Sequence, residues 1–108
     1  DQKIKIAGQP ELARAGEATG LYSQLVIEFP QDRRASRNLS LAFQLRGQLH
    51  ARAAAATTGA ARERERAAAK GAYLEALRLL ESLRERQLLA DADVKLLDDV
   101  RAAAARFE

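Results

Sequence analysis

Apolar residues recur every three or four positions through most of the chain, which predicts a protein built of helices. The first predicted helix spans residues 10–28 and ends before Pro30, because the residue that precedes a proline is disfavoured in the helical region. The second spans about residues 34–56 and the third about residues 60–86. A fourth amphipathic helix begins near Asp91, which is a favourable N-cap residue.

The start of the chain has a different pattern. Isoleucine and lysine alternate in residues 1–9, which predicts a short extended N-terminal arm ahead of a helical domain at 10–108. Short connections between helices make consecutive helices antiparallel neighbours. The predicted fold is therefore all-α, an up-down antiparallel four-helix bundle.

The composition excludes several classes of function. The chain has 108 residues, enough for one domain, and contains no cysteine, so disulfides and thiol chemistry are excluded. One histidine without cysteine argues against a zinc site, and the phosphate-loop, dinucleotide-binding and hydrolase motifs are absent. We therefore expect no enzymatic activity, no metal and no cofactor. No apolar run approaches the length of about 20 residues that a membrane span needs, so we expect no membrane partner and a cytoplasmic location.

The charge is unevenly distributed along the chain. No Asp or Glu occurs from Arg33 to Arg62, whereas the formal net charge of the whole chain is +3. A basic segment in an otherwise balanced chain predicts an anionic partner, with RNA or another nucleic acid the leading candidate. Aromatic residues are only 5% of the chain, so contacts should be mainly to phosphate and sensitive to salt. The candidate nucleic-acid-binding residues are Arg33, Arg34, Arg37, Arg52 and Arg62.

Two further residues of this segment need an explanation. On a helical wheel Arg46 falls within the apolar arc of the second helix, together with Leu41 and Leu45, and His50 lies next to it. An unpaired guanidinium is costly to bury, so Arg46 must pair with a carboxylate, extend to solvent, or lie at an interface. We assign Arg46 and His50 to an oligomer interface or a buried ion pair.

The order of these features resembles a known family. Phe29-Pro30 is followed by a charged turn, a helix with Gln44-Leu45-Arg46, a long helix with Tyr73-Leu74-Glu75-Ala76-Leu77, and a final amphipathic helix. Over about residues 11–107 this resembles the four-helix proteins that include the ribosomal-RNA intervening-sequence proteins and the accessory variability determinants of diversity-generating retroelements. The resemblance implies a ring-like homopentamer that binds template RNA and the retroelement's reverse transcriptase through basic surfaces.

A second interpretation remains open from the residues alone. The chain can equally be a helical protein–protein interaction module or scaffold without nucleic-acid binding. In that case the arginines solubilise an alanine-rich sequence or pair with an acidic protein.

Overall fold

The structure is a computed structural model that describes the backbone of residues 2–107 and the side chains of residues 10–107. Within that range it is all-helical, with no strand, which confirms the predicted fold class. A short 3-10 helix, η1, precedes the last of four α-helices. The elements are α1 (Gln2–Glu28), α2 (Arg33–Ala55), α3 (Gly59–Glu85), η1 (Asp91–Asp93) and α4 (Val94–Ala105).

The start of the chain differs from the prediction. The sequence pattern predicts an extended arm over residues 1–9, but α1 begins at Gln2 and passes through Pro10 without a break in the helix. No strand lies in residues 2–107 with which an extended arm could pair, and lysine, glutamine and alanine in this stretch are good helix formers. Residue 1, the remainder of the predicted arm, lies outside the described residues.

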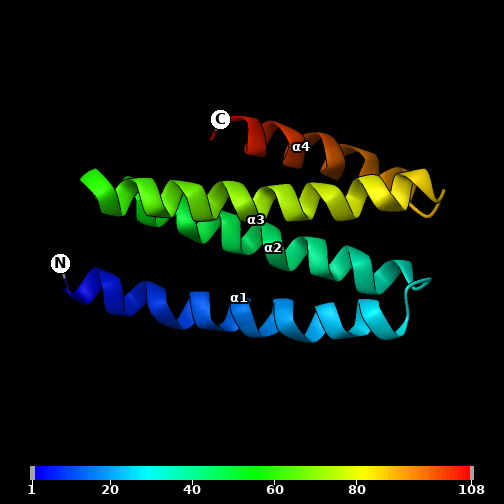
Figure 1. The fold of residues 1–108 in the computed structure, drawn as a ribbon, viewed down its shortest axis with the longest axis horizontal. Helices are drawn as coiled ribbons and strands as arrows, with labels where there is room; N and C mark the ends of the chain where they lie inside the picture. The colour runs from blue at the N-terminus through cyan, green and yellow to red at the C-terminus, as the bar shows by residue number, and fades with distance from the viewer. Residues whose placement is uncertain (1, 108) are drawn as a thin grey trace.

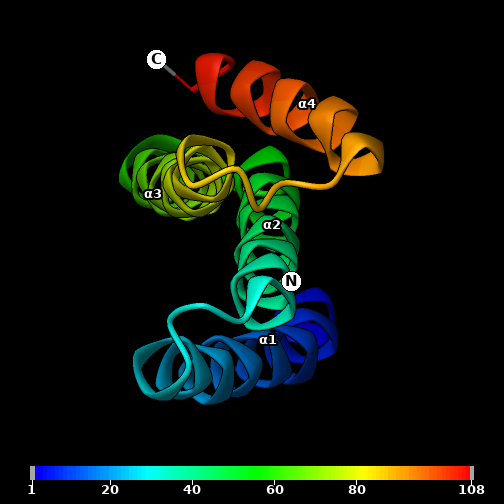
Figure 2. The same ribbon diagram turned by 90° about the vertical axis from the view of Figure 1, so that its right-hand side faces the viewer.

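The helices pack in sequence order along the long axis of the molecule. α1 packs on α2, α2 on α3, and α3 on α4, and successive helices run in opposite directions (Figure 1). Viewed along that axis, α1 and α4 lie on opposite sides of α2 (Figure 2). The chain therefore leaves open the seam at which α1 and α4 would meet in a closed bundle.

The tightest part of the core lies between the last three helices. Its fully buried residues come from α3 and α4, with Phe43 of α2 packed against them. The helix α1 supplies small residues instead, because the buried members of its described side chains are Ala15 and Thr19. The core cluster consists of Ala76, Leu80, Leu83, Leu97 and Val100.

The helices α2 and α3 approach each other most closely at Gly47. A Cβ atom on Gly47 would lie 2.8 Å from the ring of Tyr73, so only glycine fits there without displacing the ring. The ring is itself fixed, because it is 8% exposed and stacks on Phe107 with the ring centroids 5.9 Å apart. Nearby, the Ser40 hydroxyl donates to the Ala76 carbonyl at 3.2 Å.

The helix ends explain where the chain turns. Asp32 accepts a hydrogen bond from the Arg34 backbone N–H at 2.9 Å and caps α2. Asp91, the predicted cap of the last helix, instead begins η1, and α4 starts three residues later. Asp93 then precedes α4 without capping it, because its carboxylate bonds to Arg37.

Replacement of Gly47 tests the close approach of α2 and α3. We expect Gly47→Ala to lower the free energy of unfolding by about 1–3 kcal/mol, because the new methyl group overlaps a ring that cannot move away. Gly71→Ala is the matched control, since a Cβ there meets nothing within 4 Å, and alanine should stabilise the helix by about 0.5–1 kcal/mol. Urea denaturation of both variants measures this; a Gly47→Ala protein as stable as the original would contradict the packing.

Tyr73 also predicts how stability depends on pH. Burial raises the pKa of Tyr73 above its ordinary value of 10.0, while the Arg106 charge opposes that shift. The folded protein thus holds the phenol proton more tightly than the unfolded chain does. Its stabilising effect is complete below pH 10.0 and is lost as the pH rises through the folded-state pKa.

Urea denaturation at about pH 8 and about pH 11 measures this effect. We expect the stability of the original chain to fall more steeply over this range than that of Tyr73→Phe, which lacks the titrating group. Equal slopes for the two proteins would show that Tyr73 does not carry the dependence.

Candidate nucleic-acid interface

Two of the five arginines predicted to bind phosphate bond within the fold. The Arg62 Nε donates to the Ala54 carbonyl at 3.1 Å, near the end of α2, where helix carbonyls lack partners. The Arg37 Nε donates to Asp93 at 2.9 Å, and the Asp93 side chain is only 11% exposed. Arg62 thus links α3 to α2 by a hydrogen bond, and Arg37 links α2 to η1 by an ion pair.

The other three arginines face solvent. Arg33 is exposed and makes no ion pair within residues 10–107. The Arg34 side chain is 85% exposed and lies 3.8 Å from Asp32, and that of Arg52 is 74% exposed and lies 3.7 Å from Glu11. Exposed pairs at such distances contribute little, so these guanidinium groups stay accessible to an anion.

Exposed side chains of α2 follow a single line along the helix. They recur every three or four residues and therefore share one side of it. From the first to the last the line covers about 27 Å, at about 1.5 Å per residue. The exposure of these side chains shows that neither α1 nor α3, the helices that pack on α2, covers this line. We call it the α2 face: Arg34, Arg37, Leu41, Leu45, Gln48 and Arg52.

The centre of the α2 face is apolar. Leu41 is 36% exposed and Leu45 is 45% exposed, although the sequence placed both in the buried arc of the helix. The buried arc is rotated from the predicted one, because Ser36 and Ser40 are buried, with Ser40 bonded to Ala76 of α3, while these leucines turn out. The signal available in the sequence was the position of Arg34, Arg37 and Arg52 on the same side as the two leucines.

The Arg34 end of the α2 face borders a hollow between α2 and α1. This hollow has a volume of about 260 Å³ and is lined by Tyr22, Leu25 and Phe29 of the α1 end together with Arg34 and Asn38. Phe29 is 56% exposed there. An aromatic ring and an accessible guanidinium thus lie side by side at this end of the molecule.

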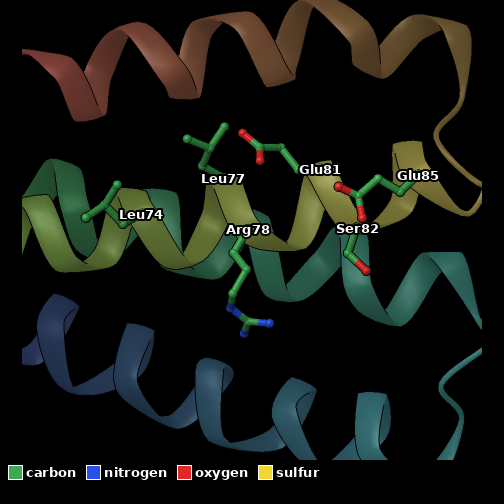
Figure 3. A pocket seen from close by; sticks show the side chains of 6 residues that line it. All are labelled: Leu74, Leu77, Arg78, Glu81, Ser82 and Glu85. Atoms are coloured by element: carbon green, nitrogen blue, oxygen red, sulfur yellow. The ribbon is translucent and has the colours of Figure 1, made fainter.

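A second surface hollow, on α3, is unsuited to an anion. Its volume is about 270 Å³, and Glu81 and Glu85 are among the residues that line it. In Figure 3 Leu77 and Glu81 point toward α4 while Arg78 points toward α1. The Arg78 guanidinium is already bound to Glu75 at 2.8 Å. The two glutamates would repel phosphate, so we exclude this face from the candidate interface.

Arg46 and His50 occupy different environments. The His50 Nδ1 lies 2.7 Å from the Glu65 carboxylate on α3, and the histidine side chain is 16% exposed. Arg46 has no carboxylate within ion-pair distance among residues 10–107. Its guanidinium donates to the Thr19 hydroxyl at 3.4 Å and lies over the Phe43 ring at 5.8 Å. The Arg46 Nε is buried without a hydrogen-bond partner.

Other kinds of site find no support in the described part of the chain. Residues 2–107 hold no cluster of three or more side chains suited to a metal ion. None of the helices described is both long and apolar enough to cross a membrane. Comparison of the sequence and fold with protein-family models, curated proteins and solved structures gave no match.

The isolated position of Arg46 predicts an unusual response to substitution. We expect Arg46→Met to raise the free energy of unfolding by about 1 kcal/mol, because it removes a partly buried charge and an unbonded Nε while keeping the apolar volume. Arg37→Met is the matched control and should lower stability by about 1–3 kcal/mol, since it leaves the Asp93 carboxylate without its partner. Thermal and urea unfolding measure whether each substitution raises or lowers the free energy of unfolding. A loss of stability in Arg46→Met would mean that the contacts of Arg46 with Thr19 and Phe43 stabilise the fold.

Proposed function

We propose that this protein is a non-enzymatic, oligomeric accessory protein of the cytoplasm that binds RNA or another nucleic acid. The observation that carries the proposal is the α2 face, on which Arg34, Arg37 and Arg52 share one exposed side of a helix that contains no acidic residue. By the family resemblance the partners are template RNA and the reverse transcriptase of a diversity-generating retroelement.

The charge of the α2 face supports contact with phosphates rather than reading of bases. Its arginines are separated along about 27 Å of helix, so each can meet a different phosphate of one strand. Arginine binds phosphate through two parallel hydrogen bonds, which favours the residue for this role. Three or four contacts from one chain give only modest affinity, and repetition of the face in an oligomer would raise it by avidity.

Oligomerisation is supported by the open seam between α1 and α4. We propose that the up-down antiparallel four-helix arrangement is completed between chains, with a homopentamer favoured by the resemblance. A neighbouring copy packed at the seam would bury Leu41 and Leu45, which the single chain leaves exposed, and would leave Arg34 and Arg52 at the two edges of that contact, accessible to RNA.

The same two leucines favour a second candidate function. An apolar centre with arginines around it is typical of protein–protein interfaces, in which arginine is enriched and the rim is polar. On this alternative the α2 face binds a protein, and the chain is a helical interaction module or scaffold without nucleic acid.

Light scattering with and without a structured RNA, at low and at moderate salt, separates the two candidates. An oligomer that gains RNA mass and releases it on addition of salt supports the nucleic-acid proposal, because phosphate contacts weaken as counterions compete. A particle of any size whose mass is unchanged by RNA at low salt rejects it and leaves the interaction module.

Substitution of the exposed arginines tests which residues bind phosphate. We expect the triple variant Arg33→Gln, Arg34→Gln and Arg52→Gln to weaken RNA binding. For a single-stranded RNA, the slope of log affinity against log salt should fall by about 0.7 for each arginine–phosphate pair that the substitutions remove. Arg37 is left in place because its bond to Asp93 supports the fold.

The control for this experiment removes the same charge elsewhere. Arg64, Arg78 and Arg84 are exposed residues of α3 outside the α2 face, and their replacement by glutamine lowers the net charge equally. Filter-binding titrations across salt compare the two variants. Equal loss of affinity in both would show that net charge, and not the α2 face, governs binding.

A further inference from the structure

A third hollow lies where the connector from α3 to η1 passes the start of α2 (Figure 2). Its volume is about 290 Å³, and residues far apart in the sequence build it. The floor is apolar and the rim carries three arginines and one carboxylate. It is lined by Arg33, Arg34, Arg37, Leu83, Leu88, Ala90, Ala92 and Asp93.

One guanidinium on the rim is held in a fixed orientation. The Arg37 Nε is bound to Asp93 at 2.9 Å, and Asp93 is only 8% exposed. The two terminal nitrogens of Arg37 make no hydrogen bond within residues 10–107. A guanidinium oriented in this way presents its free N–H groups to an oxyanion with less loss of side-chain entropy than a mobile arginine.

The rim retains positive charge after internal pairing. The negative charge of Asp93 offsets the positive charge of Arg37, and Arg34 lies 3.8 Å from Asp32. Arg33 has no ion pair among residues 10–107. A monoanion fits this balance better than a phosphate monoester, which carries a charge of about −1.5 to −2 and would lie near the Asp93 carboxylate.

The floor supplies apolar contact beside the charge. Leu83 is 2% exposed and belongs to the core cluster, and Leu88 packs against that cluster, so neither can move aside easily. Ala90 and Ala92 are small and leave the space above them empty. A ligand that places hydrocarbon here gains burial that a bare inorganic anion cannot gain.

We propose that this hollow binds an aliphatic carboxylate, with the carboxylate on Arg37 and Arg33 and the hydrocarbon on Leu83 and Leu88. A short-chain organic acid and the C-terminal residue of a peptide share this chemistry. The proposal goes beyond the proposed function, because it adds a pocket with an apolar floor at the start of α2, where Arg34 and Arg37 belong both to the α2 face and to the rim of the hollow.

Titration of the ¹⁵N-labelled chain with hexanoate, followed by amide NMR shifts, tests the proposal. We expect saturable shifts confined to residues 33–37 and 83–93, with a dissociation constant on the order of millimolar for so small a ligand. Acetate, which lacks the hydrocarbon, and hexylamine, which lacks the carboxylate, should each bind at least about tenfold more weakly. A peptide ending in leucine, with and without C-terminal amidation, distinguishes the peptide source from the free acid.

Two variants and one control assign the binding to the hollow. Arg33→Gln removes the unpaired charge, and Ala92→Leu fills the exposed space without altering any charge; each should weaken hexanoate binding at least about tenfold. Arg64→Gln, on the far part of α3, should leave it unchanged. Hexanoate shifts that do not saturate, or that persist in Ala92→Leu, would overturn the proposal.

RNA binding is measured on the same proteins, so that the two proposals can fail separately. Ala92→Leu should lose hexanoate binding while keeping its affinity for RNA, since it leaves every arginine in place. Tighter binding of hexyl phosphate than of hexanoate at this hollow would overturn the carboxylate assignment and assign the pocket to the phosphate-binding surface.

Discussion

The contact between α2 and α3 constrains the rest of the molecule. Gly47 lets the Tyr73 ring lie against the α2 backbone, and the Ser40 hydroxyl bonds to the Ala76 carbonyl in the same contact. With α3 this close, one side of α2 is covered. The helix α1 covers a second side, so α2 exposes only the side that faces away from both helices. Only some residues of α2, which contains no Asp or Glu, are therefore exposed to solvent, and helix packing determines which ones they are.

The charge pattern has a structural role as well as the proposed functional one. Because α2 contains no acidic residue, every carboxylate that pairs with its side chains comes from another element or from the preceding turn. Glu11 on α1, Glu65 on α3 and Asp93 on η1 lie within ion-pair distance of Arg52, His50 and Arg37, respectively. Separation of opposite charges onto different helices favours the observed neighbours over other pairings. The gap in acidic residues, which from sequence alone indicated an external anion, thus also serves the packing of this chain.

The sequence predicted the helices better than their surroundings. The apolar period placed both ends of α2 and of α3 within one residue of their observed positions. A helical wheel of α2 could not show that Leu41 and Leu45 are exposed. The wheel gives the direction of each side chain around its own helix, but not the directions from which the neighbouring helices pack. The sequence predicted Asp91 as the cap of the last helix, but α4 begins after Asp93, whose carboxylate pairs with the distant Arg37 and does not cap the helix.

The helix α1 is attached to the rest of the chain mainly through α2. Its described side chains bury little, and their contact with α2 includes Arg46, whose Nε has no partner. Small residues such as Ala15 and Thr19 let two helices approach closely, but each buries little apolar area. An interface that covered the seam would supply α1 with a second neighbour, and for this reason the oligomer contact that we propose lies there and not on α3.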